Sequence, residues 1–388
     1  MEKVVITGMG VVSANADNKD AFAEACQSGK VGIKECTVFN TDGLMTPYFG
    51  QADSIQGEDR FCALLQKSAE EMMRDAKVDK KYIASLGSGC RMFFGTLLYS
   101  SDAYYRHSIS KQQDEPDSYI AHMNDYSIYA KDLLGVKGTV TVVSSACASG
   151  TTAAGMALDY IRNGICDCAV VGGVDALSII AAYGFHALKS LSSGICNPYD
   201  KERDGINIGE CGAFFLFESL TSAKKRNAKI YCEAAGYAIG NDAYHITSPE
   251  PDGKGACHTM KAAMEDAGIT PSDIDYVNGH GTGTRINDAM ETKAIDKLME
   301  GRPVSVSSTK STIGHCMGAA GAIELASIIL SMQGRKYIPM PRLSSRIEGN
   351  FEMSAQTYDL GIEYAISNSF AFAGNSASIV IKNAGGGA

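Results

Sequence analysis

Cys147 is the residue whose setting in the sequence best suits nucleophilic chemistry. It follows a run of β-branched residues at 139–143, which indicates a strand, and it precedes apolar residues at helical spacing up to Gly164. A thiol between a strand end and a helix start faces unpaired N–H groups and the positive end of the helix dipole, which predicts a lowered pKa and a thiolate. The alternative is a buried, inert thiol, because the chain has 12 cysteines and free cysteine is commonly buried.

Three later loops, each after a predicted strand, carry groups that would complement a thiol. They hold, in chain order, His280, Thr282, Thr284, Asp288 and Glu291; then Lys310, His315 and Glu324; and then Phe370, Phe372 and Gly374. Each histidine alone is a weak signal, because a histidine in a Gly-rich loop more often has no catalytic role. A thiolate and two imidazoles in one pocket would suit acyl transfer through a thioester, followed by chemistry on a carbanion or enolate.

Two pairs of segments repeat in the same order along the chain, which favours an internal duplication. Residues 71–89 resemble 263–281, as a helix end, a link, a strand and a Gly-rich loop. Residues 142–164 resemble 304–334, as a strand, a Ser-rich corner and a helix rich in Gly and Ala. Duplication would place the corner at Cys147 opposite its counterpart across a pseudo-twofold axis. The alternative is that any two segments of an α/β protein look alike.

Composition excludes several classes of function. The 388 residues are 45% hydrophobic and 20% charged, as in ordinary globular proteins, and the net charge of −9 disfavours a nucleic-acid partner. Residues 1–14 read as a first strand and not as a signal peptide, and we expect no membrane span. The 12 cysteines show no CxxC pairs and the seven histidines do not cluster, which predicts a cytoplasmic protein with reduced thiols and no metal site.

Four motifs resemble the signatures of the β-ketoacyl-acyl carrier protein synthases, of the elongating type, in the thiolase superfamily. They are SSACASG, GHGTGT, SSTKSTIGHCMGAAGAIE and NPYDKERDGINIGECGA. The resemblance implies an α/β fold of the duplicated thiolase type, layered α-β-α-β-α, with two mixed and largely parallel sheets. Its halves would be residues 1–228, with an insertion at about 98–134, and residues 229–388.

The same resemblance implies a decarboxylative Claisen condensation. Cys147 would take the acyl chain from the phosphopantetheine arm of an acyl carrier protein. His280 and His315 would bind the malonyl thioester oxygen, assist the loss of carbon dioxide and stabilise the enolate. The backbone N–H groups of Cys147 and Phe372 would form the oxyanion hole. No cofactor bound by the protein itself is implied.

Other positions would support these groups. Lys310 and Glu324 resemble a pair that orients the His315 loop, although a buried ion pair could simply hold the loop. Thr282 and Thr284 match positions that bind the pantetheine arm, and plain turn residues are the alternative. For Asp288 and Glu291, at the start of a helix, we favour a structural role.

The sequence also departs from the family in its gate and its docking surface. The gating loop is Ala371, Phe372, Ala373 and Gly374, where the family usually has Gly-Phe-Gly-Gly. Two alanines restrict the backbone, so we expect the loop to open differently. The early basic cluster that docks the acidic carrier protein is reduced here to Arg60, and Asn197 replaces an arginine.

The segment TRINDAMET (284–292) resembles the ketosynthase subunits of type II polyketide synthases, and this resemblance implies a chain-length-factor-like sister subunit. The alternative is a housekeeping fatty-acid elongation synthase that acts as a homodimer. A thiolase acting on coenzyme A thioesters would need a second cysteine in the last loop, NSFAFAGNSAS, which has none. A non-catalytic subunit that sets chain length is the remaining alternative, and the presence of Cys147 disfavours it.

Overall fold

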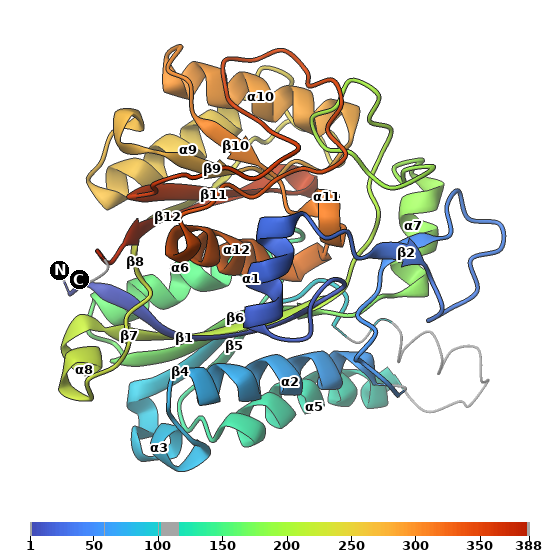
Figure 1. Ribbon diagram of the computed structural model, residues 1–388. Coiled ribbons are helices and arrows are strands. Elements are labelled where there is room, and N and C mark those ends of the chain that lie inside the picture. Colours follow the sequence, from blue (N-terminus) through green and yellow to red (C-terminus); the bar gives the residue numbers. More distant parts are fainter. Residues whose placement is uncertain (1, 58, 100, 102–115, 386–388) are drawn as a thin grey trace.

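The computed structural model describes residues 2–57, 59–99, 101 and 116–385, and at 116–124 it describes the backbone alone. Helices and strands alternate in five layers, α-β-α-β-α, from the bottom of Figure 1 to the top. This layering agrees with the fold class that the sequence predicts.

The lower outer layer and the sheet above it come from the first part of the chain. The outer layer contains α2 (Arg60–Asp75), α3 (Lys80–Ser85) and α5 (Pro116–Leu134). The lower sheet contains β1 (Val4–Ser13), β4 (Cys90–Gly95), β5 (Val140–Val143), β6 (Cys168–Asp175) and β7 (Cys211–Ser219). The middle layer contains α1 (Lys19–Ser28), α6 (Ser149–Arg162) and α12 (Ala320–Gly334).

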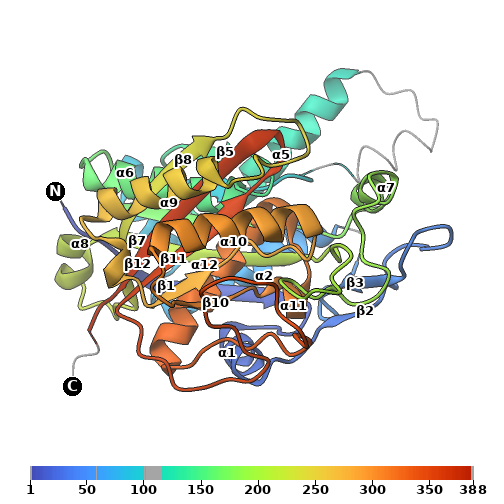
Figure 2. The same cartoon turned by 90° about the horizontal axis from the view of Figure 1, so that it is seen from above.

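The upper sheet and its outer helices come from the second part of the chain. The sheet contains β8 (Cys232–Asn241), β9 (Tyr276–Asn278), β10 (Ser305–Ser307), β11 (Tyr364–Phe370) and β12 (Asn375–Asn383). Helices α9 (Lys254–Ala267) and α10 (Arg285–Met299) lie side by side over it (Figure 2). The remaining elements are β2 (Ile33–Glu35), β3 (Tyr48–Gly50), α7 (Ile179–Ala187), α8 (Leu220–Lys225) and α11 (Lys310–Ile313).

The two sheets have the same strand order. The lower sheet runs β1-β7-β6-β4-β5 and the upper sheet runs β8-β12-β11-β9-β10. When the strands of each sheet are numbered one to five in chain order, both sheets have the spatial order one, five, four, two, three. The duplication expected from the sequence repeats is therefore visible in the topology. The division at residue 228 stays a prediction, which this repeat supports.

The pairing of the strands differs from the prediction in two ways. The two sheets are continuous, because Val4–Ile6 of β1 pairs with Cys232–Ala234 of β8, so ten of the described strands, all but β2 and β3, form one folded sheet. Of its nine neighbouring pairs, four are parallel and five antiparallel, so "largely parallel" is wrong and "mixed" is right. The last two strands of each half are antiparallel neighbours, which the alternation of helices and strands did not reveal.

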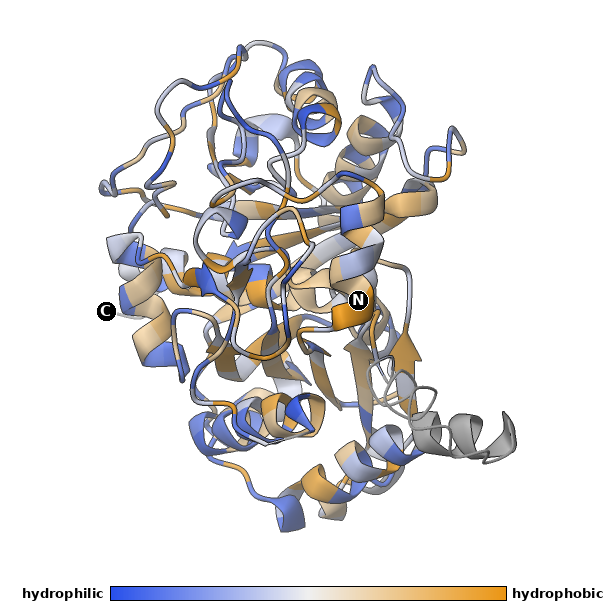
Figure 3. Cartoon of the chain, turned by 90° about the vertical axis from the view of Figure 1, so that its right-hand side faces the viewer, coloured by the Kyte–Doolittle hydropathy of each residue, from blue (hydrophilic) through white to orange (hydrophobic). Residues whose placement is uncertain are grey.

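Three apolar cores fill the four gaps between layers, because the central core lies on both sides of the middle layer. On β4 the side chains alternate, so that Phe93 joins the central core while Phe94 joins the lower core. The central core is built around α6 and α12, and the upper core is built around α9 and α10. Figure 3 shows apolar residues concentrated on the strands and polar residues on the outer helices.

Helices α6 and α12 approach each other closely at two glycines. A Cβ atom on Gly150 would lie 2.8 Å from the Ala322 nitrogen, and one on Gly321 would lie 2.1 Å from Thr151 Oγ1. No side chain fits at either point, so the glycines set the spacing of the two helices. That spacing matters because α6 begins just after Cys147 and α12 begins just after His315.

Two further predictions concern single segments. Residues 102–115 of the predicted insertion lie outside the described residues, and the described side chains of α5 pack beside α2, with Ala130 and Leu134 in the lower core. The segment Met317–Gly334 has the length and apolarity of a membrane span. It is 89% buried, however, as expected for a core helix.

Candidate active site

Cys147 lies in a tight corner between β5 and α6. Ser149 holds this corner, because its hydroxyl accepts a hydrogen bond from the Ser145 N–H (2.9 Å) and donates one to the Ala146 carbonyl (2.5 Å). Ala146 has a φ of +53°, a conformation that a residue other than glycine adopts only where its surroundings hold it. The strained turn places the Cys147 side chain at the start of α6, as the sequence predicted.

His315 lies in the equivalent corner between β10 and α12. Its N–H donates to the Asn207 carbonyl (2.7 Å), and the Met317 N–H donates to its ring Nδ1 (3.2 Å). The opposite ring atom, Nε2, is 3.1 Å from Cys147 Sγ. The two corners therefore bring together residues 168 positions apart in the chain.

His280 lies at the other side of the thiol. Its ring is 5.3 Å from the His315 ring, and its Nδ1 is 3.4 Å from Lys310 Nζ. One ligand atom from each of Cys147, His280 and His315 lies within 4.8 Å of the others. The structure thus brings together the three groups that the sequence proposed as one site.

The hydrogen bonds of the two imidazoles fix their tautomers. Nδ1 of His315 receives the Met317 N–H, and Nδ1 of His280 faces the Lys310 ammonium, which can only donate. Each Nδ1 is therefore an acceptor, and the ring proton of each neutral imidazole is on Nε2. Burial and the positive charge of Lys310 both lower the pKa of each histidine well below its ordinary value, so both rings are neutral.

Burial raises the pKa of the Cys147 thiol to about 12. Lys310 acts in the opposite direction, but its effect is the smaller one. The expectation of a lowered pKa is therefore wrong, because burial of the thiol destabilises the thiolate more than the helix start and Lys310 stabilise it. At neutral pH the resting group is a thiol.

Lys310 and Glu324 form a buried ion pair behind the imidazoles. Both side chains are almost fully buried, and burial raises the pKa of Glu324 to about 7. The pair joins α11 to α12 beside the His315 loop, and its role in orienting that loop stays a prediction. The contact of Lys310 with His280 Nδ1 was not indicated by the sequence, because the direction of a long lysine side chain cannot be deduced from spacing alone.

Backbone donors of the His280 loop are held by two carboxylates. Glu291 accepts from the N–H groups of His280 (2.7 Å) and Gly281 (2.8 Å). Asp288 accepts from the Thr282 N–H (3.0 Å). This agrees with the structural role favoured for both acids.

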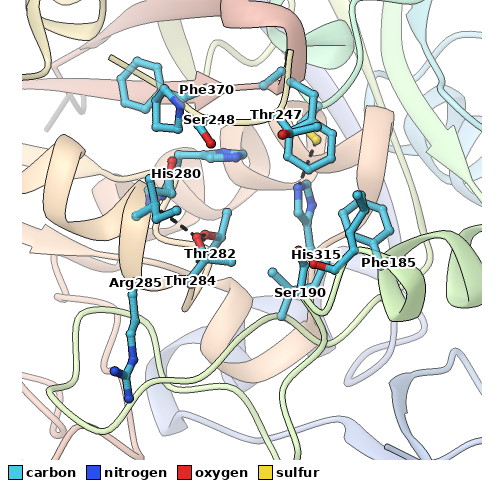
Figure 4. A pocket seen from close by; sticks show the side chains of 18 of the residues that line it. Phe185, Ser190, Thr247, Ser248, His280, Thr282, Thr284, Arg285, His315 and Phe370 are labelled. Atoms are coloured by element: carbon cyan, nitrogen blue, oxygen red, sulfur yellow. Dashed lines mark hydrogen bonds between the residues drawn. The ribbon is translucent and has the colours of Figure 1, made fainter. Parts of the chain in front are cut away.

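The site opens into a pocket of about 400 Å³ (Figure 4). Of the predicted residues, the lining includes Cys147, His280, His315, Thr282, Thr284, Ala371, Phe372 and Gly374. The hydroxyls of Thr282 and Thr284 are 2.9 Å apart at its wall. Lys310, Glu324 and Ala373 are not among the residues that line it.

The predicted gating loop closes one side of the pocket. The Phe372 ring stacks on Phe185, with 5.8 Å between ring centroids. Ala373 has a φ of +60°, its N–H donates to the Ile246 carbonyl (2.7 Å), and its own carbonyl accepts from Asn241 Nδ2 (2.7 Å). An alanine therefore occupies a left-handed position that favours glycine.

Asp175 was missed by the sequence reasoning. It ends β6, is fully buried, and accepts hydrogen bonds from Thr96 Oγ1 (2.6 Å), the Leu98 N–H (2.9 Å) and the Gly318 N–H (2.7 Å). It thereby anchors the turn that follows His315. An acid directly after the apolar run VVGGV was the available signal.

The ligand atoms of Cys147, His280 and His315 are close enough to surround a metal ion. A histidine that binds a metal through Nε2 needs an acceptor at Nδ1, where its second proton must lie. Both Nδ1 atoms here face donors instead, from Met317 and Lys310. The cluster therefore does not fit a metal ion.

Comparison with known proteins places the chain in one family. The model of the beta-ketoacyl synthase N-terminal domain matches residues 40–223, and that of the C-terminal domain matches residues 231–344. A 3-oxoacyl-[acyl-carrier-protein] synthase 2 from Staphylococcus aureus is 32% identical over 98% of both chains. The enzyme of the same name from Synechocystis sp. is 30% identical over 98% of both.

Comparison with solved structures leads to the same family. A type II polyketide synthase acyl-carrier protein in complex with its ketosynthase has a TM-score of 0.89 at 28% identity, covering 98% of this chain and 99% of that one. The ishigamide ketosynthase/chain length factor has a TM-score of 0.89 at 26% identity, covering 99% and 100%. A beta-ketoacyl synthase from Burkholderia phymatum has a TM-score of 0.87 at 27% identity, covering 99% of this chain and 100% of that one. The chain therefore belongs to the β-ketoacyl synthase family, acyltransferases that form carbon–carbon bonds.

Proposed function

We propose that the chain condenses malonyl-acyl carrier protein with an acyl chain carried as a thioester on Cys147. One observation carries this proposal: a thiol and the Nε2–H groups of two neutral imidazoles meet in one buried pocket. Such donors suit negative charge that develops on an oxygen atom during the reaction. These imidazoles do not suit the role of a base, because the unprotonated nitrogen of each ring, Nδ1, already accepts a hydrogen bond.

In the acylation step, Cys147 Sγ attacks the carbonyl carbon of the incoming thioester. The bond from that carbon to the pantetheine sulfur breaks, and the thiol proton of Cys147 leaves on the pantetheine sulfur. The His315 Nε2–H, 3.1 Å from Sγ, stabilises the charge that develops on sulfur. The N–H groups of Cys147 and Phe372 would hold the carbonyl oxygen.

In the condensation step, the bond between the malonyl carboxylate and its α-carbon breaks and carbon dioxide leaves. The electron pair becomes an enolate, whose oxygen accepts from the Nε2–H groups of His280 and His315. The α-carbon then attacks the acyl carbonyl on Cys147, the carbon–sulfur bond breaks, and the released thiolate takes one proton from solvent.

We further propose that Thr282 and Thr284 hydrogen-bond the pantetheine arm, which brings in all acyl groups. Their hydroxyls lie at the pocket wall beside His280 (Figure 4). The reaction then needs no cofactor bound by the protein. An acyl carrier protein is the partner, and a cytoplasmic location agrees with 12 free cysteines.

The test is mass spectrometry of the intact chain after incubation with acyl-carrier protein. We expect one acyl group, absent from the Cys147→Ala variant. A chain that stays unmodified, both alone and with a partner subunit, would show that the proposal is wrong.

For the pathway, we propose the ketosynthase subunit of a type II polyketide synthase. Support comes from the similar structures of a type II polyketide ketosynthase and of a ketosynthase/chain length factor, and from the segment 284–292. The alternative is fatty-acid elongation by a homodimer. It is favoured by the relatives at 30–32% identity, which are named 3-oxoacyl-[acyl-carrier-protein] synthase 2. Acylation of the purified chain alone favours the homodimer, and acylation only after co-expression with a sister subunit favours the polyketide enzyme.

Either assembly would use the edge of the lower sheet. Strand β5 pairs only with β4 among the described strands, and its four β-branched or aliphatic residues are half-buried. An open edge of this kind is a surface for pairing with another chain. We expect a dimer in sedimentation at micromolar concentration, and a Thr141→Lys variant that shifts toward monomer, while Ile165→Lys, at an exposed position outside β5, does not.

A further inference from the structure

Tyr199 lies at the centre of the contacts that hold the His280 loop. Its side chain is fully buried. Its backbone φ is +61°, which is rare for a bulky side chain and persists only where the surroundings fix it. No part of the proposed mechanism uses this residue.

Tyr199 donates to both carboxylates under the loop. Its N–H donates to Asp288 Oδ2 (2.8 Å), and its O–H donates to Glu291 Oε2 (2.7 Å). Glu291 in turn accepts the N–H groups of His280 and Gly281. One side chain is thus linked through a single carboxylate to the backbone of a proposed catalytic histidine.

The hydroxyl of Tyr199 matters because Glu291 has few other partners. Among the described residues, Glu291 has no cation within ion-pair distance, and Tyr199 provides its one side-chain donor. A buried carboxylate without a cation depends on each hydrogen bond that it accepts. The ring also fills the space under the loop, since a Cβ on Gly281 would lie 2.5 Å from Tyr199 Cε2.

We propose that Tyr199 is a positioning residue for His280. Its hydroxyl aims the Glu291 carboxylate at the His280 and Gly281 N–H groups, and this fixes the ring that must meet the enolate oxygen. The inference rests on the proposed condensation. It predicts a separation of steps, because Glu291 holds the backbone of His280, which acts in the proposed condensation step, whereas the proposed acylation step uses His315 and backbone N–H groups.

The first test is Tyr199→Phe, which removes the hydroxyl and keeps the ring. We expect release of carbon dioxide from malonyl-carrier protein to slow by about 10- to 100-fold, with Cys147 acylation unchanged within about twofold. The matched control is Tyr337→Phe, an equally buried phenol that donates to the Val306 carbonyl (2.8 Å) outside the site loops. It should change neither rate. Equal slowing of both steps, or of neither, in Tyr199→Phe would overturn the proposal.

The second test is a double-mutant cycle with Glu291→Gln, which also serves if Tyr199→Phe does not fold. Glu291→Gln should show the same separation of steps, and adding Tyr199→Phe to it should slow decarboxylation no further, because both changes act through one hydrogen bond. If the double variant slowed decarboxylation by the product of the two single-variant factors, Tyr199 would act only by packing.

A third measurement needs no substrate. Imidazole ¹⁵N NMR should show the His280 resonances shifted in Tyr199→Phe and those of His315 unchanged. If the wild-type chain neither acylates nor decarboxylates, the proposed function fails while this measurement still decides the role of Tyr199. Unchanged His280 resonances would show that Tyr199 does not position the ring.

Discussion

Cys147 combines a nucleophile's position with the pKa of an inert thiol. Burial holds this pKa at about 12, so the thiolate fraction is small at neutral pH and grows about tenfold for each pH unit. We therefore predict that the rate of Cys147 alkylation by iodoacetamide rises about tenfold per unit from pH 7 to pH 10. Peptide mapping by mass spectrometry isolates this site from the other cysteines. A plateau below about pH 9 would contradict the buried-thiol interpretation.

Lys310 and Glu324 offer a second test at the scale of the residue. Replacing Lys310 by Met leaves a buried carboxylate without its cation, which we predict to lower the free energy of unfolding by about 3–5 kcal/mol. The Lys310→Met, Glu324→Leu double variant should recover much of that loss, because no uncompensated charge remains. Urea denaturation measures both variants. A double variant less stable than the single one would mean that the pair contributes more than charge compensation.

Sequence and structure agree best on which residues gather and least on how each is oriented. Cys147, His280 and His315 could be predicted because each follows a strand, and strand ends in repeated halves converge. The contact of Lys310 with His280 could not, since a four-carbon side chain reaches several neighbours. Nor could the thiol pKa, which depends on water excluded by residues distant in sequence.

At the scale of the element, the gating loop carries an avoidable strain. Ala373 has a left-handed backbone, which costs a residue with a Cβ atom about 1–2 kcal/mol. We predict that Ala373→Gly raises the free energy of unfolding by about 1 kcal/mol. Ala371→Gly is the matched control, because Ala371 is extended, with a φ of −127°, and glycine there should lower stability by about 0.5–1 kcal/mol. Thermal unfolding of the two variants should shift in opposite directions.

The crossing of α6 and α12 is the second element whose geometry can be tested. In Gly321→Ala the new methyl group meets backbone and Thr151, so the helices must separate at a cost of about 1–3 kcal/mol. We predict that Cys147 acylation falls by about tenfold or more while circular dichroism stays native. Gly334→Ala, at the far end of α12, meets only the end of the Gln27 side chain and should acylate normally. Normal acylation in Gly321→Ala would show that the helix spacing does not control the site.

For the whole molecule, the sequence repeats anticipated the duplication and the family resemblance implied the five layers, but neither indicated the strand directions. The repeats are detectable because the paired segments keep the same Gly, Ser and Ala positions. The antiparallel pair of β6 with β7 depends on a long connection, residues 176–210, which carries no periodic signal. The pair of β11 with β12 follows from a four-residue connection, which the sequence analysis interpreted as a gate and not as a hairpin turn. The three-residue join between β1 and β8 is likewise too short for the sequence to indicate.

The close crossing of α6 and α12 at two glycines also makes the reaction rate sensitive to the alignment of the two sheets. Cys147 is carried by the lower sheet and His315 by the upper one, and the α6–α12 contact, together with the hydrogen bond from the Gly318 N–H to Asp175 of β6, holds them 3.1 Å apart. A slide of one helix along the other by half an ångström would stretch that hydrogen bond without breaking a strand pair. Turnover should therefore fade on heating before any spectroscopic sign of melting.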